Sequence, residues 1–300
     1  MEGSPLDRAM TERSNPASER LDAMTTLEIV DLMNAQDSLV PAAVHAAREA
    51  IARAVELVVA ALGAGGRLFY IGAGTSGRLG TLDAAECPPT FGTDPDQVQA
   101  VIAGGREALV CAIEGAEDRA EDAAAALRER GFAAGDVLAG IAACGLTPFV
   151  RGGLEFARGL GARTLFITCN PSPSDLPPAD VVIAVDVGPE VLTGSTRLKA
   201  GTATKLILNT LTTAAMVRLG KCYGNLMVDL RATNAKLRAR AARILRQLCG
   251  LDDAAARRTL AEAGGELKVA ILMARLGLAR DAAIALLERH RGILRRALGE

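Results

Sequence analysis

Short apolar runs separated by longer helical patterns dominate the first two thirds of the chain. The runs are brief and rich in β-branched residues, which predicts strands at 67–71, 98–103, 136–143, 164–168 and 181–185. Helical patterns between or beside them predict helices at 38–63, 76–86, 107–130, 148–160 and 195–219. Because buried strands that alternate with helices form parallel sheets, we predict an α/β fold with a doubly wound parallel sheet.

Both ends of the chain differ from this pattern. Residues 1–37 are polar and broken by Pro5 and Pro16, which predicts an N-terminal arm with a short helix at 26–34. Beyond about residue 229 the strand pattern disappears, and helices are predicted at 232–248, 252–263, 267–276 and 280–298. We therefore expect three parts: the arm (1–37), the α/β domain (38–228) and a small C-terminal helical domain (229–300).

Single residues predict two helix ends. Ser38 is a suitable N-cap for the helix at 38–63, because its hydroxyl can accept a hydrogen bond from a first-turn amide. Pro88 and Pro89 are expected to end the helix at 76–86, because proline has no amide hydrogen to donate.

The charge and aromatic content argue against nucleic-acid binding. The chain has 34 basic and 35 acidic residues, so its net charge at pH 7 is -1. Only 3% of the residues are aromatic and tryptophan is absent, which leaves little with which to stack on bases. We therefore expect a small-molecule ligand and no nucleic-acid partner.

Cysteine and histidine usage gives no sign of a metal site. The cysteines are scattered without a C-x-x-C pair, and neither histidine, His45 or His290, lies near one of them in sequence. We find no signal-peptide pattern at the N-terminus and no apolar run that reaches the roughly 18 residues of a membrane span. The prediction is a soluble cytoplasmic protein with reduced thiols, no cofactor and no membrane partner.

A glycine-rich loop follows the first predicted strand. Residues 72–77 read Gly-Ala-Gly-Thr-Ser-Gly and match the G-x-G-x-x-G pattern of dinucleotide-binding folds. The second predicted strand ends in Gly104 and Gly105 instead of an acidic ribose ligand, which argues against a dinucleotide. Hydroxyls beside free amides at a helix start suit a phosphate monoester, so Gly74, Thr75 and Ser76 are candidate ligands. A tight turn with a serine cap is the structural alternative.

Two further loops carry suitable groups at the ends of later strands. The second covers 143–148 and the third 188–202; their candidate binding residues are Cys144, Gly145, Thr147, Glu190, Ser195, Thr196 and Lys199. Loops at the carboxyl ends of parallel strands meet at one edge of the sheet, so we expect them to share a ligand. No aromatic residue accompanies them to stack on adenine, and no Walker-type motif occurs, which favours a sugar phosphate over a nucleotide.

Several ordered segments carry a family resemblance that spans nearly the whole chain from Thr11. The segments 11–16, 72–80, 83–91, 114–118, 192–201 and 223–229 resemble the SIS (sugar isomerase) domain family and, within it, the N-acetylmuramic acid 6-phosphate etherases. The resemblance implies a cytoplasmic homodimer that acts in peptidoglycan recycling and amino-sugar catabolism. Such an enzyme, a carbon–oxygen lyase, releases D-lactate and N-acetylglucosamine 6-phosphate from its substrate.

The resemblance assigns Glu86 and Glu114 as the catalytic pair of acid–base residues. Opening the sugar ring exposes an aldehyde that acidifies the proton on C2, so a base can remove this proton while lactate leaves from C3. Apolar neighbours of Glu86, among them Cys87 and Phe91, are expected to raise its pKa, which suits an acid that protonates lactate. Glu114 is then the base at C2. By sequence alone Glu114 begins an acidic run, which is more typical of a solvated helix face.

The second loop departs from the family. The family usually has serine and arginine where this chain has Cys144 and Leu146, so we expect weaker phosphate binding. Residues 188–205 are also similar to the glucokinase regulatory protein, and a non-catalytic sugar-phosphate sensor is therefore the main alternative. That relative is longer and has two SIS units, which argues against it. A SIS-type isomerase and a Rossmann oxidoreductase are further alternatives.

Overall fold

The structure, a computed structural model, describes residues 9–171, 176–230 and 235–300. Contacts between residues divide the chain into two compact units. The first unit comprises Met1–Ala85 and Asp96–Thr212, and the second comprises Glu86–Pro95 and Thr213–Glu300. The domain boundaries predicted from the sequence stay predictions.

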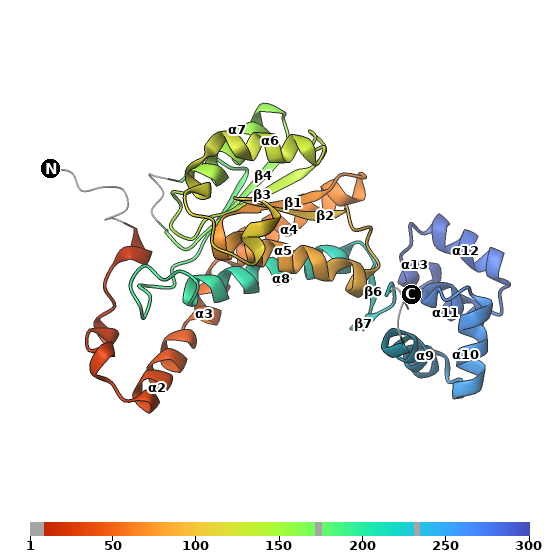
Figure 1. Ribbon diagram of the computed structural model, residues 1–300. Helices are drawn as coiled ribbons and strands as arrows, with labels where there is room; N and C mark the ends of the chain where they lie inside the picture. The colour runs from red at the N-terminus through yellow and green to blue at the C-terminus, as the bar shows by residue number, and fades with distance from the viewer. Residues whose placement is uncertain (1–8, 172–175, 231–234) are drawn as a thin grey trace. The chain divides into compact units, whose positions relative to one another are not determined.

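A parallel five-stranded sheet forms the centre of the first unit (Figure 1). Its order is β2-β1-β3-β4-β5, with β1 at Leu68–Gly72, β2 at Val98–Ile102, β3 at Val137–Ile141, β4 at Arg163–Thr168 and β5 at Val181–Ala184. Each neighbouring pair is parallel. The order reverses direction at β1, so crossover helices cover both faces, and the predicted doubly wound α/β fold is confirmed.

Helices lie on both faces of this sheet. One face carries α4 (Arg48–Gly63) and α5 (Gly74–Phe91), and the other carries α6 (Ala120–Glu129) and α7 (Pro148–Gly159) (Figure 1). Close packing depends on small residues: a Cβ on Gly80 of α5 would lie 2.9 Å from Cβ of Tyr70, and one on Gly153 of α7 would lie 2.6 Å from Cδ1 of Ile71. The strand residues Phe69, Leu138 and Phe166 are fully buried between these layers.

The N-terminal part of the chain belongs to the first unit. Three short 3-10 turns (Met10–Glu12, Pro16–Ser18 and Leu21–Ala23) precede α2 at Thr26–Asp37, which confirms the helix predicted near 26–34. Thr25 and Glu28 form a capping box at its start. Ser38 ends α2 instead of starting the next helix, because its hydroxyl donates back to the carbonyl of Ala35. The prediction of a single helix at 38–63 was wrong, because the chain forms α3 at Val40–Ala46 and then α4.

Helices dominate the second unit, as predicted for the C-terminus. They are α9 (Ala235–Cys249), α10 (Asp253–Glu262), α11 (Leu267–Leu276), α12 (Arg280–Arg289) and α13 (Leu294–Ala297). The helix predicted at 280–298 is divided because Arg291 and Gly292 have positive φ angles, 55° and 74°. The start of the helix predicted from 232 lies outside the described residues. A two-stranded hairpin, β6 (Cys222–Tyr223) and β7 (Leu226–Met227), precedes these helices and was not predicted.

Two other helix predictions were wrong. Pro88 and Pro89 lie inside α5, which runs on to Phe91: the φ angle that proline fixes is itself helical, and both prolines fall in the last turn, where little helix follows them. The helix predicted at 107–130 is confined to α6; before it the chain makes only two 3-10 turns, at Arg106–Leu109 and Ala116–Asp118. Gly115 between them is left-handed, with φ of 70°, which interrupts a regular helix.

The helix predicted at 195–219 is observed as α8, at Lys199–Arg218.

Among the described residues, no helix has both the length and the apolar character needed to cross a membrane.

Candidate active site

The glycine loop turns sharply from β1 into α5. A Cβ on Gly72 would lie 2.8 Å from the amide nitrogen of Gly77, and a Cβ on Gly77 would lie 2.5 Å from Cγ1 of Ile102. Gly74 has a φ of 51°. Side chains at Gly72 and Gly77 would collide with the loop or with β2, so glycine at these two positions allows the first turn of α5 to lie against the strand ends. Because the first amides of a helix have no acceptor within the helix, the start of α5 is suited to binding an anion.

The first and third loops meet at α8. Thr75 and Ser76 lie in the first turn of α5 and are partly exposed. A Cβ on Gly201 of α8 would lie 3.6 Å from Cγ2 of Thr75 and 3.5 Å from the carbonyl of Thr196. Ser195 and Thr196 are also partly exposed, and the structure places the start of α8, at Gly201, beside Thr75 of the first loop.

The second loop is held at its backbone by a residue just after the end of β4. Asn170 is buried, and its amide side chain donates to the carbonyl of Cys144 at 3.0 Å. Gly145 has a φ of 85°, and Thr147 is the N-cap residue of α7. The thiol of Cys144 and the hydroxyl of Thr147 are partly accessible, as a binding role requires.

Buried Cys169 connects β4 with the start of α8. Its thiol lies 3.8 Å from the carbonyl of Ala200. Burial raises the pKa of the Cys169 thiol to about 12, and the nearby negative charges of Glu190 and Asp186 add to this effect. Cys169 is therefore a packing residue that stays protonated at neutral pH.

Glu190 caps α8 from a fully buried position. Its carboxylate accepts the amide of Lys199 at 3.0 Å and the amide of Ala200 at 2.9 Å. Burial raises the pKa of Glu190, and these two hydrogen bonds oppose that effect. Both oxygens of Glu190 are thus engaged in holding the start of the helix that carries the third loop.

The ammonium group of Lys199 is bound by the N-terminal part of the chain. Its Nζ donates to Oε1 of Gln36 at 2.8 Å, and the side chain is 1% exposed. Asn15 donates to the same Gln36 oxygen at 2.9 Å and to the carbonyl of Pro189 at 3.0 Å. Burial lowers the pKa of Lys199, whereas the negative charge of Glu190 favours its charged form. The N-terminal residues therefore position the third loop.

Glu114 lines a cavity of about 150 Å³ beside the glycine loop. Gly74 and Arg78 of α5 form one wall, and Ile113, Glu114 and Gly115 form another. Glu114 is exposed and lies in an irregular segment, not on the helix face that its acidic run suggests. A carboxylate is thus placed against the loop that is suited to phosphate.

Glu86 lies in α5 within the second unit. Cys87 and Phe91, four residues apart on one face of the helix, are buried, whereas Glu86 faces outward and is exposed. The apolar enclosure that the sequence predicts for Glu86 is therefore not supplied by its immediate neighbours.

Three supporting side chains were missed by the sequence analysis. Arg78 donates to the carbonyls of Leu109 and Cys111, while Asn170 and Gln36 hold the second and third loops. Arg78 lies within a segment that resembles the family, but neither composition nor spacing shows which carbonyls it binds.

Within the described ranges, no group of three His, Cys, Asp or Glu side chains is arranged to hold a metal ion.

Comparisons with known proteins identify the family. Residues 50–158 match a family model described as the glucokinase regulatory protein N-terminal SIS domain. A curated relative from Edwardsiella ictaluri, named N-acetylmuramic acid 6-phosphate etherase, is 52% identical over 295 residues, which cover 98% of each chain. A relative with the same name from Gloeobacter violaceus is 57% identical, over 88% of this chain and 86% of its own. Another, from Synechococcus sp. (strain CC9605), is 54% identical, over 96% of this chain and 92% of its own.

The solved structures that match are more distant. The phosphoheptose isomerase of Neisseria gonorrhoeae is 20% identical, with a TM-score of 0.49 over 64% of this chain and 99% of the other. The likeness to the regulatory protein is limited to part of the α/β unit, whereas the etherases match nearly the full length, so the regulator alternative is not favoured. This chain belongs to the N-acetylmuramic acid 6-phosphate etherase family.

Proposed function

We propose that this protein cleaves the D-lactyl ether of N-acetylmuramic acid 6-phosphate, giving N-acetylglucosamine 6-phosphate and D-lactate. The observation that carries the proposal is the cavity that places Glu114 beside Gly74 and the glycine loop. A helix start that can bind phosphate and a carboxylate that lines the same cavity are what an elimination reaction on a sugar phosphate requires. The printed names of relatives that match nearly the whole chain support the choice of substrate.

The proposed binding mode uses all three loops. Gly74, Thr75 and Ser76 bind the phosphate, with further contacts from Cys144, Gly145, Thr147, Ser195 and Thr196. Glu190 and Lys199 contribute by holding the third loop in place.

The proposed reaction is an elimination followed by addition. Glu114 removes the C2 proton of the open-chain aldehyde, and the electron pair forms the C2–C3 double bond as the C3–oxygen bond breaks. Glu86 donates a proton to the departing lactate oxygen. Water then adds its oxygen to C3 and a proton to C2, which restores a saturated sugar. Glu86 is exposed within the described chain, so its carboxyl group is accessible to a bound substrate.

We further propose that the protein is a cytoplasmic homodimer of peptidoglycan recycling, as the family resemblance implies. Leu27, Val30 and Leu39 are exposed near the N-terminus of the described chain and provide apolar surface for a second copy. Light scattering of the purified protein measures the oligomeric state directly, and a monomer at micromolar concentration would contradict the dimer.

A coupled D-lactate assay tests the activity. We expect lactate release from the wild type and a loss of about 10²-fold or more in Glu114→Gln and in Glu86→Gln, because each removes a general acid–base group. Glu121→Gln changes an exposed glutamate at the start of α6 and should leave the rate unchanged.

Two results would contradict the proposal. Wild-type rates in both Glu86→Gln and Glu114→Gln would remove the catalytic assignment. A folded wild-type protein that binds the sugar phosphate but releases no lactate would instead support a sugar-phosphate sensor.

A further inference from the structure

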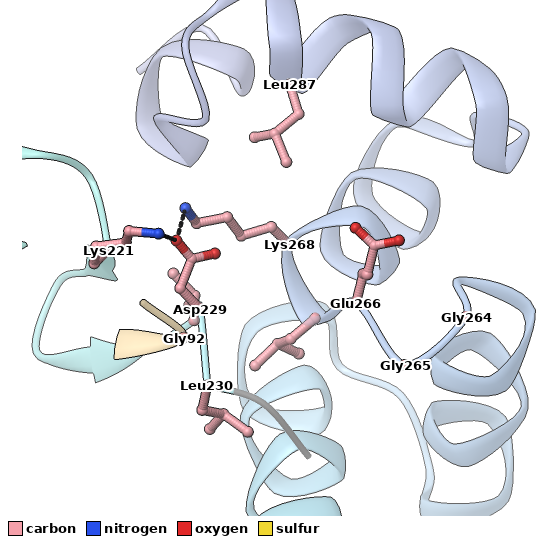
Figure 2. Close-up of a pocket in the computed structure, with 11 residues that line it drawn as sticks. Gly92, Lys221, Asp229, Leu230, Gly264, Gly265, Glu266, Lys268 and Leu287 are labelled. Carbon is pink, nitrogen blue, oxygen red and sulfur yellow. Dashed lines mark hydrogen bonds and ion pairs between the residues drawn. The ribbon is translucent and has the colours of Figure 1, made fainter. Parts of the chain in front are cut away.

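A cavity of about 440 Å³ lies within the second unit, and the proposed reaction does not use it (Figure 2). Lys221 and Asp229, at the two ends of the hairpin segment, line one side. The start of α11, including Lys268, lines another, and Leu287 of α12 points toward the space between them. A cavity of this size is within the range of small-metabolite sites.

Two lysines share one carboxylate oxygen at this cavity. Nζ of Lys268 lies 2.7 Å from Oδ2 of Asp229, and Nζ of Lys221 lies 3.1 Å from the same atom (Figure 2). Lys268 is only 5% exposed and also donates to the carbonyl of Gly292 at 2.7 Å. One carboxylate cannot neutralise two ammonium groups, so the cluster has one excess positive charge.

Burial adds to the need for a further negative charge. It lowers the pKa of Lys268, whereas the charge and hydrogen bond of Asp229 oppose this effect. A second anion near Lys268 would stabilise the ammonium form in the same way.

The start of α11 adds backbone donors. Gly264, Gly265 and Glu266 line the cavity directly before the helix. Glu266 is the N-cap residue but makes no side-chain capping bond; its carboxylate instead pairs with Arg280 at 3.0 Å. The Glu266 side chain therefore accepts no first-turn amide, and the positive end of the helix dipole lies beside the cavity that the lysines line.

We propose that this cavity binds a small organic anion through a phosphate or carboxylate group. The anionic group would lie between the two lysine ammonium groups and the first turn of α11. The apolar part of the ligand would contact Leu230 and Leu287, which line the same cavity. None of the residues that line this cavity belongs to the three sugar-phosphate loops, so the inference goes beyond the proposed function.

The small number of lysines allows a direct test on the full chain. The sequence contains only Lys199, Lys205, Lys221, Lys236 and Lys268. Protein labelled with ¹³C at the lysine ε-carbon therefore gives a simple spectrum that single substitutions can assign. Lys221 and Lys268 report on the cavity, Lys199 reports on the third loop, and exposed Lys205 and Lys236 serve as internal controls.

Inorganic phosphate and D-lactate are titrated separately against sodium chloride of equal ionic strength. We expect the Lys221 and Lys268 signals to shift along one saturable curve with at least one of the two anions, while Lys205 and Lys236 follow the chloride control. Saturation with phosphate alone or with lactate alone identifies which anionic group the cavity binds. Because Lys199 is followed separately, binding at the sugar-phosphate loops is not mistaken for binding here.

Lys221→Gln provides the matched variant, because Lys268 remains to pair with Asp229 in the folded protein. We expect anion binding, followed at Lys268, to weaken by about tenfold, as loss of one charged hydrogen bond predicts. Lys236→Gln should leave it unchanged. The proposal is overturned if neither cavity lysine shifts beyond the chloride control or if all the lysines shift together. Lactate release from the etherase substrate is measured independently, so the two proposals can fail separately.

Discussion

Arg78 joins the glycine loop to the segment that carries Glu114. Its Nε donates to the carbonyl of Leu109 at 3.2 Å, and its Nη2 donates to the carbonyl of Cys111 at 2.9 Å. The segment between residues 103 and 117 is largely irregular, so these two hydrogen bonds limit its freedom where regular structure does not. We infer that Arg78 is a positioning residue for Glu114.

Replacing Arg78 tests this role. In Arg78→Ala we expect kcat for lactate release to fall by about tenfold or more with a smaller change in KM, because a misplaced base slows the chemical step. Arg78→Lys should recover part of the rate, since an ammonium group can reach one of the carbonyls. Arg106→Ala, an exposed arginine of the same segment, is the control. An unchanged kcat in Arg78→Ala would show that the segment holds its conformation without this side chain.

At the scale of elements, the start of α8 depends on one buried carboxylate. Glu190 accepts two successive backbone amides of α8 and is not exposed at all. The neighbouring Lys199 is attached to Gln36 of α2. These contacts join the third loop, α8 and the N-terminal part of the chain within the first unit.

Glu190→Gln should destabilise this part of the fold. A glutamine has one carbonyl oxygen in place of two carboxylate oxygens, so one α8 amide loses its acceptor and the amide nitrogen meets another donor. We expect a loss of about 1–3 kcal/mol in the free energy of unfolding. Urea denaturation measures it, with Glu155→Gln on the exposed side of α7 as control. Equal midpoints for wild type and Glu190→Gln would mean that the cap contributes no stability.

At the scale of the whole molecule, each unit has a hydrophobic core of its own. In the first unit, strand residues such as Phe69 and Leu138 pack against α6 and α7. In the second, Leu245, Ile271 and Leu272 pack among the C-terminal helices. Separate cores of this kind allow separate units of local unfolding.

Leu272→Ala tests whether the two cores unfold separately. Leu272 is fully buried, so the cavity left behind should cost about 2–5 kcal/mol. Hydrogen exchange should show faster exchange in α9, α10 and α11, while amides of β1 and β3 keep their protection. Leu276→Ala, at a position that is 44% exposed in the same helix, is the control. Equal loss of protection in both units would show that they unfold together.

Much of the fold was predictable from local patterns. All five strands of the sheet lie near their predicted positions. A short apolar run between two helical patterns is too short for a buried helix, so a buried strand is the remaining interpretation. The prediction of a helix at 107–130 was wrong in its first half. The mixture of alanine and acidic residues there resembles a helix face, but Gly115 has a left-handed conformation that interrupts a helix. The hairpin was missed although Gly224 and Asn225 between two short runs are a recognised turn signal.

The candidate site was predictable only in part. The loop pattern alone is enough to predict Gly74, Thr75 and Ser76 as candidate phosphate ligands, since tight turns and helix starts depend on neighbouring residues. Glu114 required the family resemblance, because its sequence surroundings are typical of a solvated helix. The three loops were expected to converge because they follow parallel strands, and the position of Gly201 beside Thr75 agrees with that expectation for the first and third loops.

The sequence by itself determined the strand-and-helix alternation, the sharp turn after β1 and the family, because each depends on adjacent residues or on their identity. The tertiary structure alone decided which distant groups meet. Gln36 binds Lys199 across 163 positions, and Asp229 binds Lys268 across 39. Such pairs have no local signal: polar side chains of this kind occur throughout the chain, and only the folded backbone brings particular ones within hydrogen-bonding distance.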